Sequence, residues 1–152
     1  MTRKVDIDEL LGCHSARIRR ATRRVAQIYE RTMEPAGVTG SQFTLLGNLL
    51  GAAQAGHPGV PASVLAARLD IDPTTLTRTL KPLRTQKLVR ERRGDNDRRV
   101  RLIEITDKGR AALIEAIPHW RRAQKEIEGS LGNTLTAALR EALDRSLDKL
   151  TA

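Results

Sequence analysis

Apolar residues recur every three or four positions in the first and last parts of the chain, which is the pattern of amphipathic helices. The first stripe predicts one helix from Asp8 to about Met33, and the breaker sequence at 35–37 (Pro-Ala-Gly) ends it. From Thr134 onward, leucines repeat at steps of four, four, four and three residues and predict a final helix. This last stripe consists of Leu135, Leu139, Leu143, Leu147 and Leu150.

A longer helix is expected directly before the final one, from a cap at Thr106 to about Leu131. Pro118 lies inside it and is expected to kink it, because proline removes a backbone hydrogen bond and clashes with the preceding turn. Gly132-Asn133 should then separate the two helices.

Three shorter helices are expected in the middle of the chain. Ser41 is a candidate N-cap for the first of them, and Pro61 opens the second. Asp72-Pro73 supplies a capping residue and a first-turn proline for the third, which runs to about Gln86. The buried face of this third helix is expected to consist of Leu76, Leu80 and Leu83.

The hydrophobic period then changes. Two short runs at 88–93 and 100–105 alternate partly, and turn-forming residues lie between them at 94–99, so a β-hairpin is expected. The order of elements predicts a mainly α fold with a small β-hairpin wing, a winged helix-turn-helix. The apolar stripes of the long terminal helices have no evident partner in so small a domain, so we expect a symmetric homodimer.

Basic charge is concentrated in the middle of the chain. The 152 residues carry 27 basic and 18 acidic side chains, a net charge of +9, and segment 60–106 alone has 11 basic and 6 acidic ones. Such clustering favours a polyanionic partner, with nucleic acid ahead of an acidic membrane surface. Aromatic residues make up only 2% of the chain, so its core must rest on aliphatic side chains, which suits packed helices.

Several classes of protein are disfavoured by the composition. No run of about 18 apolar residues is present, and the acidic start is unlike a secretory signal peptide. Cys13 is the single cysteine, and His14, His57 and His119 lack the spacing of metal ligands. We therefore expect a cytoplasmic protein without enzymatic activity, cofactor, metal site or membrane partner.

An ordered set of motifs resembles the MarR family of bacterial transcriptional regulators. They are Gly40-Ser41-Gln42-Phe43-Thr44-Leu45-Leu46, Leu69-Asp70-Ile71-Asp72, Leu76-Thr77-Arg78-Thr79-Leu80-Lys81-Pro82-Leu83, Leu88-Val89-Arg90, Asp97-Arg98-Arg99 and Ile103-Glu104-Ile105-Thr106-Asp107-Lys108-Gly109. The resemblance implies a homodimer that binds a palindromic operator in double-stranded DNA and releases it on meeting a small ligand or an oxidant. Residues 36–106 would then bind DNA, and 1–35 with 107–152 would form the dimer.

The chain departs from this family at Lys87, where relatives usually have glycine after the recognition helix. A residue other than glycine costs about 1 kcal/mol in the left-handed conformation, so a different helix end is expected here.

The helix after Asp72 has the composition of a recognition helix. Opposite its leucines it presents Thr74, Thr75, Thr77, Arg78 and Lys81. Threonine hydroxyl and methyl groups contact base edges, arginine binds guanine in a bidentate manner, and Lys81 is placed to meet a phosphate. The alternative is an ordinary solvated helix face, although threonine is a mediocre helix former for that purpose.

The tip of the hairpin carries a second candidate contact. Arginine is favoured in a narrow minor groove, and the resemblance assigns an Asp-x-Arg pattern to the wing, which here is Asp97 and Arg99. Asp97 is expected to hold Arg99 in place, and Arg98 to meet a phosphate. Further candidate phosphate contacts are Arg68, Arg84, Arg90, Arg92 and Arg93.

Two ways of receiving a signal are left open by the sequence. His14 and Arg17 lie beside the apolar stripe of the first helix and suit the carboxylate of a small aromatic acid, with apolar walls from Phe43, Leu46 and Trp120. Alternatively, Cys13 senses peroxide, because a helix N-terminus and nearby cations favour a reactive thiolate. For His14 and Cys13 the ordinary alternatives are a packed histidine and an inert cysteine.

The sequence therefore predicts a homodimeric transcriptional regulator, a repressor relieved by a small aromatic acid. A redox-sensing regulator that acts through Cys13 is the first alternative. A sequence-indifferent architectural DNA-binding protein is the second, and it would show no preference for one operator.

Overall fold

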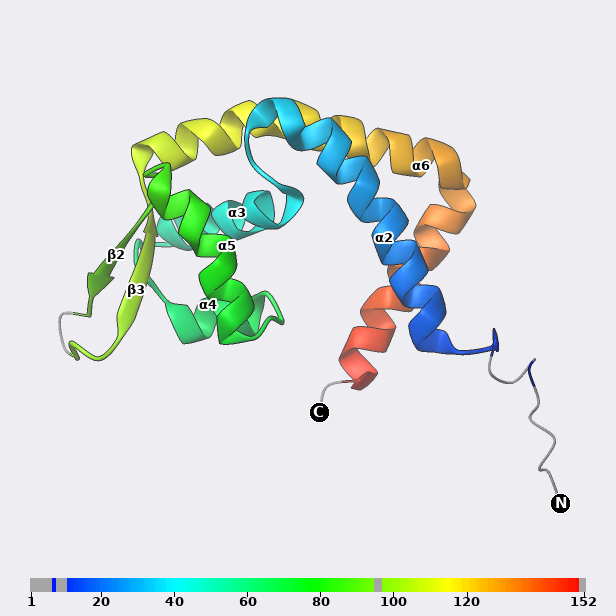
Figure 1. Ribbon diagram of the computed structural model, residues 1–152, viewed down its shortest axis with the longest axis horizontal. Helices are drawn as coiled ribbons and strands as arrows, with labels where there is room; N and C mark the ends of the chain where they lie inside the picture. Colours follow the sequence, from blue (N-terminus) through cyan, green and yellow to red (C-terminus); the bar gives the residue numbers. More distant parts are fainter. Residues whose placement is uncertain (1–6, 8–10, 95–96, 151–152) are drawn as a thin grey trace, which may run out of the picture.

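The computed structural model describes residues 7, 11–94 and 97–150. It is built from helices with one small sheet, in agreement with the predicted winged helix-turn-helix (Figure 1). In chain order the elements are α2 (His14–Met33), the 3₁₀ turn η1 (Glu34–Ala36), α3 (Gly40–Gln54), β1 (Val60–Pro61), α4 (Ala62–Arg68), α5 (Pro73–Thr85), β2 (Val89–Arg93), β3 (Arg101–Ile105) and α6 (Asp107–Leu150).

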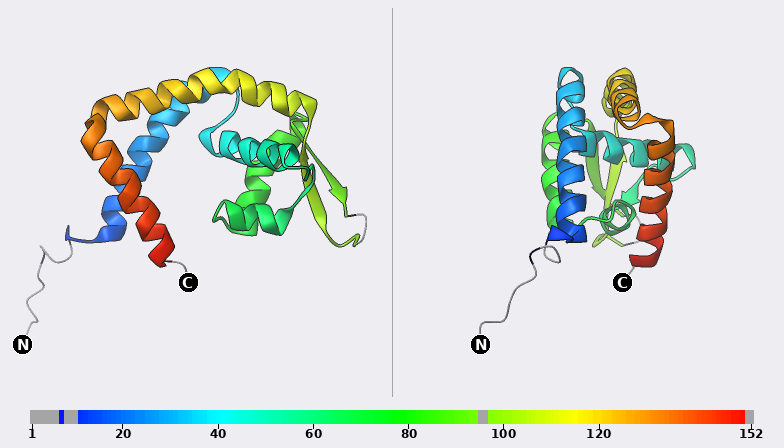
Figure 2. Two further views of the ribbon diagram at one scale, coloured as in Figure 1. Left: turned by 180° about the vertical axis from the view of Figure 1, so that it is seen from behind. Right: turned by 90° about the vertical axis from the view of Figure 1, so that its right-hand side faces the viewer.

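Two regions of the molecule are joined by the first part of α6. One is a lobe of α3, α4, α5 and the sheet; in the other, α2 lies alongside α6, away from the hairpin (Figures 1 and 2). The Tyr29 hydroxyl donates to Gln124 Oε1 at 2.7 Å, and Arg31 pairs with Glu126, so two polar contacts tie α2 to α6. Among the described residues, no helix has the length and apolar character needed to cross a membrane.

The lobe has an aliphatic core, as the composition predicts. Leu76, Leu80 and Leu83 of α5 are all buried, which confirms the predicted inner face of that helix. The largest side chains with almost no exposed surface are Met33, Leu45, Leu46, Leu49, Leu65, Leu80, Leu83 and Ile103. Phe43 stacks on Trp120 at the edge of this core, with ring centroids 5.7 Å apart.

The sheet has three antiparallel strands in the order β1-β3-β2, whereas the sequence predicts only the β2–β3 hairpin. Val60 pairs with Ile103, and Pro61 with Leu102. Pro61, which is predicted to open a helix, is the N-cap of α4 and also the second residue of β1. A strand of two residues is too short to show an alternating pattern, so its pairing depends on the partner strand.

One predicted helix start is wrong. The N-cap of α3 is Thr39 rather than Ser41: Thr39 Oγ1 accepts from Gln42 N at 3.2 Å, and Gln42 Oε1 accepts from Thr39 N at 2.9 Å. This reciprocal pair is a capping box, and the Thr-x-x-Gln spacing satisfies two backbone donors that Ser41 cannot reach. Helix α2 starts at His14, because the dihedrals of Cys13 are non-helical; the predicted start of the N-terminal helix, Asp8, lies outside the described residues.

The predicted cap at the start of α6 is confirmed, because Thr106 Oγ1 accepts from Gly109 N at 3.0 Å. The chain stays helical through Pro118, and the kink expected there stays a prediction. The direction changes at Gly132, whose φ of 74° and ψ of 163° confirm the predicted break between two helices (Figure 2).

The leucine stripe after this break is uncovered in the single chain. Its five members are between 39% and 76% exposed. In a water-soluble helix such a stripe normally packs against another element.

Candidate nucleic-acid interface

The start of α5 is fixed by Asp72, as predicted. Its Oδ1 accepts from the backbone N–H groups of Thr74 at 2.8 Å and Thr75 at 3.0 Å, and its Oδ2 accepts from the Thr75 hydroxyl at 2.5 Å. These hydrogen bonds, the one from the Thr75 hydroxyl first, lower the pKa of Asp72. The Thr75 hydroxyl thereby donates to the cap, while its methyl group and the acceptor capacity of its oxygen remain available on the exposed face.

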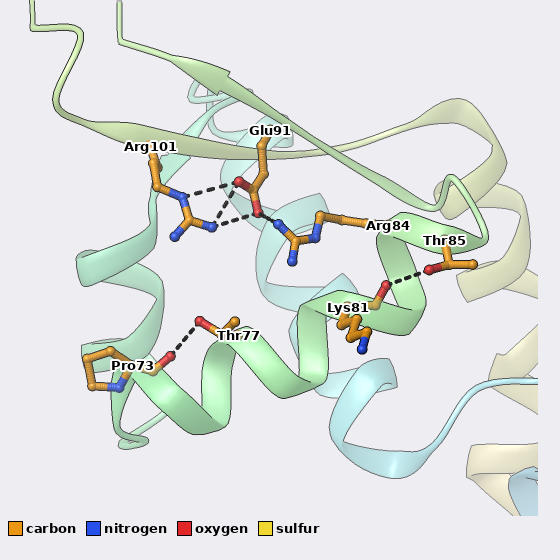
Figure 3. A network of polar contacts seen from close by, with 7 residues as sticks. All are labelled: Pro73, Thr77, Lys81, Arg84, Thr85, Glu91 and Arg101. Carbon is orange, nitrogen blue, oxygen red and sulfur yellow. Dashed lines mark hydrogen bonds and ion pairs between the residues drawn. The ribbon is translucent and has the colours of Figure 1, made fainter.

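The outer face of α5 is exposed and carries the other predicted contacts. Thr74, Thr77, Arg78 and Lys81 all lie on it, opposite the buried leucines. The Thr77 hydroxyl donates to the Pro73 carbonyl at 2.9 Å (Figure 3). Its methyl group and the acceptor capacity of its oxygen remain available.

Arg78 and Lys81 are the cations of this face. Neither side chain makes a hydrogen bond or an ion pair with any described residue. An unpaired guanidinium on an exposed helix is suited to bidentate contact with guanine or phosphate.

The turn of the hairpin places Arg98 and Arg99 in solvent. Asp97 Oδ1 accepts from the backbone N–H of Arg99 at 2.8 Å, so Asp97 holds the backbone of that residue rather than its guanidinium. The Arg93 side chain donates to the Arg98 carbonyl at 3.3 Å and also supports the turn. Arg98 and Arg99 keep their own side chains free of contacts with the described residues.

Several arginines suggested as phosphate contacts are paired with acids instead. Arg84 pairs with Glu91 at 2.5 Å, whereas Arg90 and Arg92 pair with Glu104 at 2.7 and 2.5 Å. Arg68, at the end of α4, is exposed and has no partner among the described residues. Among the described residues of the lobe, the cations without an acidic partner thus include Arg78 and Lys81 on α5, Arg98 and Arg99 at the hairpin turn, and Arg68.

Glu104 is the most deeply buried acid of the lobe, with 4% of its surface exposed. Burial raises its pKa, but hydrogen bonds from Arg92 and Arg90 outweigh that effect and hold the pKa below the ordinary value. Glu104 thus remains ionised at neutral pH and fixes both arginines on the sheet.

Lys87 adopts the left-handed conformation with a φ of 61°, so the expectation of a different helix end is wrong. Its N–H donates to the Arg84 carbonyl at 2.9 Å, and the next N–H, of Leu88, donates to the Leu83 carbonyl at 2.8 Å. Two hydrogen bonds after the last turn offset the strain that glycine would avoid.

The residues suggested for a ligand fall into two separate groups. Cys13, His14 and Arg17 are exposed at the start of α2. In contrast, Phe43 of α3 stacks on Trp120 of α6, and Leu46 of α3 is fully buried. Tyr29 of α2 lies near the second group, because it lines one cavity together with Trp120. His14 and Tyr29 are 15 residues apart on α2, which corresponds to about 22 Å. The single chain therefore does not bring the two groups together.

A cavity of about 500 Å³ lies where α2, α3 and α6 meet. Trp120 forms part of its wall, as the sequence suggests, but the other lining residues were not predicted. The complete lining is Ala26, Tyr29, Glu30, Thr39, Gly40, Ser41, Thr44 and Trp120. These residues come from three distant segments with no shared motif, so no pattern in the sequence indicates them. Among the described residues, no group of three or more His, Cys, Asp or Glu side chains is placed to hold a metal ion.

Together, the exposed capped helix and the hairpin beside it define a winged helix-turn-helix protein with long flanking helices. The MarR family model matches residues 36–100 of the chain. MosR, a transcriptional regulator of M. tuberculosis solved in complex with DNA, is 35% identical, and the match covers 92% of this chain and 99% of MosR with a TM-score of 0.74. The chain belongs to the MarR family of transcriptional regulators.

Two further relatives agree with this assignment. The transcriptional regulator ZitR of Lactococcus lactis subsp. cremoris is 30% identical over 57% of this chain. That match spans 59% of ZitR, so it reaches less than two thirds of this curated relative. The transcriptional repressor CouR, solved bound to a 23-mer DNA duplex, is 26% identical with a TM-score of 0.73, over 97% of this chain and 98% of CouR.

Proposed function

We propose that this protein is a DNA-binding regulator that places α5 in the major groove and the hairpin turn in the adjacent minor groove. The observation that carries the proposal is the outer face of α5, where Arg78 and Lys81 are exposed and unpaired among the described residues. The DNA complexes of MosR and CouR support it by similarity.

Each free cation then has a distinct role. Arg78 contacts guanine, and Lys81 contacts phosphate from the same face. Arg99 enters the minor groove from the turn that Asp97 holds, and Arg98 and Arg68 contact phosphates. Thr74, Thr75 and Thr77 lie beside base edges, and Thr75 also supports the cap.

Arg78→Ala is expected to weaken specific binding by about 5- to 150-fold, because a bidentate arginine contributes about 1–3 kcal/mol of discrimination. Arg99→Ala should weaken it as well, by removing the minor-groove contact. The measurement is fluorescence anisotropy at about 0.15 M salt, with the intergenic DNA beside the protein's own gene and with random DNA of equal length.

Arg121→Ala is the matched control for both variants, because Arg121 is an exposed arginine of α6 without a described partner. It changes the net charge equally but lies outside the winged lobe. Equal losses for Arg99→Ala and Arg121→Ala would contradict the role of the wing.

The protein is proposed to bind DNA as a symmetric homodimer, with 36–106 as the DNA-binding unit and 1–35 with 107–152 as the dimerisation region. The uncovered leucine stripe of α6 supports a second copy as the occupant of that face. A twofold dimer presents two recognition helices to a palindromic site, which suits repression of a promoter.

For the effector we propose a small aromatic acid bound in the cavity between α2, α3 and α6. The Trp120 ring offers an aromatic wall, while Ser41 and the first turn of α3 offer hydrogen-bond donors to a carboxylate. A ligand there would contact both the flanking helices and the DNA-binding lobe. The alternative is oxidation of Cys13, which is exposed directly before α2.

Ser41→Leu is expected to fill the cavity and abolish release of DNA by an aromatic acid, while DNA binding without ligand persists. Cys13→Ser should leave that response unchanged. A panel of aromatic carboxylates, and separately peroxide followed by dithiothreitol, would be titrated into the DNA complex. Release by peroxide that is lost in Cys13→Ser, without any response to the acids, would favour the redox alternative.

A further inference from the structure

Glu91 joins three elements of the DNA-binding lobe (Figure 3). Its Oε1 accepts from Arg84, in the last turn of α5, at 2.5 Å and from Arg101, the first residue of β3, at 2.9 Å. Its Oε2 accepts from the same Arg101 at 2.9 and 3.2 Å. One carboxylate of β2 therefore holds the end of the recognition helix and the partner strand of the wing.

This contact is partly shielded from water. The Glu91 side chain is 21% exposed, and the two arginines are 37% and 41% exposed. The bidentate geometry with Arg101 is the stronger form of a carboxylate–arginine contact. The group of Glu91, Arg84 and Arg101 therefore holds a more fixed geometry than an ordinary surface ion pair does.

The backbone link between α5 and β2 is short, and the start of α6 holds it by hydrogen bonds from the Thr106 hydroxyl to the Lys87 carbonyl and from Lys108 Nζ to the Gln86 carbonyl. Only 86–88 separate the two elements, and they pass through the left-handed Lys87. The Arg84–Glu91 contact spans this turn and limits rotation of α5 against the sheet. Without it, the angle between the helix and the hairpin would depend on the leucine core and on the turn with its hydrogen bonds to the start of α6.

We propose that Glu91 is a positioning residue that sets the angle between α5 and the wing, so that both engage one half-site together. The inference rests on the proposed DNA-binding function and concerns specificity rather than overall attraction to DNA. Arg78 in the major groove and Arg99 in the minor groove are carried by the two elements that Glu91 joins. A small rotation between them prevents both contacts from forming at once.

A purely electrostatic role and a positioning role of Glu91 predict different effects on DNA binding when Glu91 is replaced. Glu91 is an acid within a strongly basic segment, so its replacement by glutamine removes a negative charge beside the DNA. Phosphate attraction alone therefore predicts equal or tighter binding to any DNA without it. Positioning predicts weaker discrimination between operator and random DNA.

The test compares Glu91→Gln with Glu115→Gln in the full chain. Glu115 is an exposed acid of α6 without a described partner, so both variants change the net charge equally. The measured quantity is the ratio of dissociation constants for random and operator DNA, with the thermal midpoint recorded for each variant. We expect Glu91→Gln to lower this ratio about tenfold, the size of one lost base contact, and Glu115→Gln to leave it unchanged.

Arg84→Gln provides a second variant that removes the α5 end of the contact and keeps the Glu91–Arg101 pair. It is expected to lower the ratio similarly, although it removes a positive charge. If the wild-type ratio is well above one and Glu91→Gln leaves it unchanged, or Glu115→Gln lowers it equally, the role of Glu91 is wrong. A wild-type ratio near one would instead overturn the proposed function and this inference with it.

Discussion

Gly109→Ala is expected to destabilise the protein by about 3 kcal/mol or more, because the added methyl group has no space. An ideal Cβ at Gly109 would lie 2.0 Å from the Leu88 carbonyl oxygen and 2.9 Å from Ile105 Cγ1. That carbonyl also accepts from the backbone N–H of Thr106 at 3.1 Å, so it cannot move without loss of a hydrogen bond. The close packing of Gly109 on the Leu88 carbonyl joins the start of α6 to the start of the hairpin. Loss of this packing would weaken the DNA-binding lobe.

Gly129→Ala is the matched control in the same helix. Nothing lies within 4 Å of an added Cβ there, so alanine should stabilise the helix by about 0.5–1 kcal/mol. Urea unfolding followed by circular dichroism measures both changes. If both substitutions shifted the free energy of unfolding in the same direction, close packing at Gly109 would not be the cause.

Leu143→Glu is expected to separate the proposed dimer and to weaken operator binding by 10²-fold or more. Leu143 is the central member of the leucine stripe and is 46% exposed in the single chain. A carboxylate in that position would have to be buried without a partner on association. Separate monomers would also lose the second half-site, which contributes through effective concentration.

Ala138→Glu provides the comparison for this variant, because it adds the same charge on the opposite side of the same helix. Sedimentation equilibrium would give the molar mass, and anisotropy the affinity for the operator. A Leu143→Glu protein that keeps the mass of a dimer would contradict the role of the stripe. If the dimer dissociated equally in both variants, the added charge would be the cause rather than the loss of a leucine from the stripe.

The helices and the wing follow from the sequence because local patterns encode them. Leucines at helical spacing identify the inner face of α5, and Asp72-Pro73 marks its start by a cap that needs only neighbouring residues. The β2–β3 hairpin is equally local, since its turn and both strands are adjacent in the chain. Each of these predictions is confirmed by the structure.

The elements that the sequence does not reveal depend on distant partners. Strand β1 exists through Val60 and Ile103, which are far apart in the chain. Arg84 and Arg90 look like free cations in a basic segment, but acids on neighbouring strands or helices pair with them. The cavity between α2, α3 and α6 is equally invisible, because its walls meet only after the helices pack.

The break at Gly132 divides α6 into a long arm, between the lobe and the bend, and a shorter segment that carries the leucine stripe. In the proposed dimer, the length of this arm fixes the distance between each DNA-binding lobe and the dimer contact. Its 25 residues, 107–131, span about 37 Å, comparable to one turn of B-form DNA. Each residue added to or removed from the arm would shift the lobe by about 1.5 Å and turn it by about 100°. The length of α6 before Gly132 thereby sets which spacing of half-sites, and which side of the double helix, the two lobes reach together.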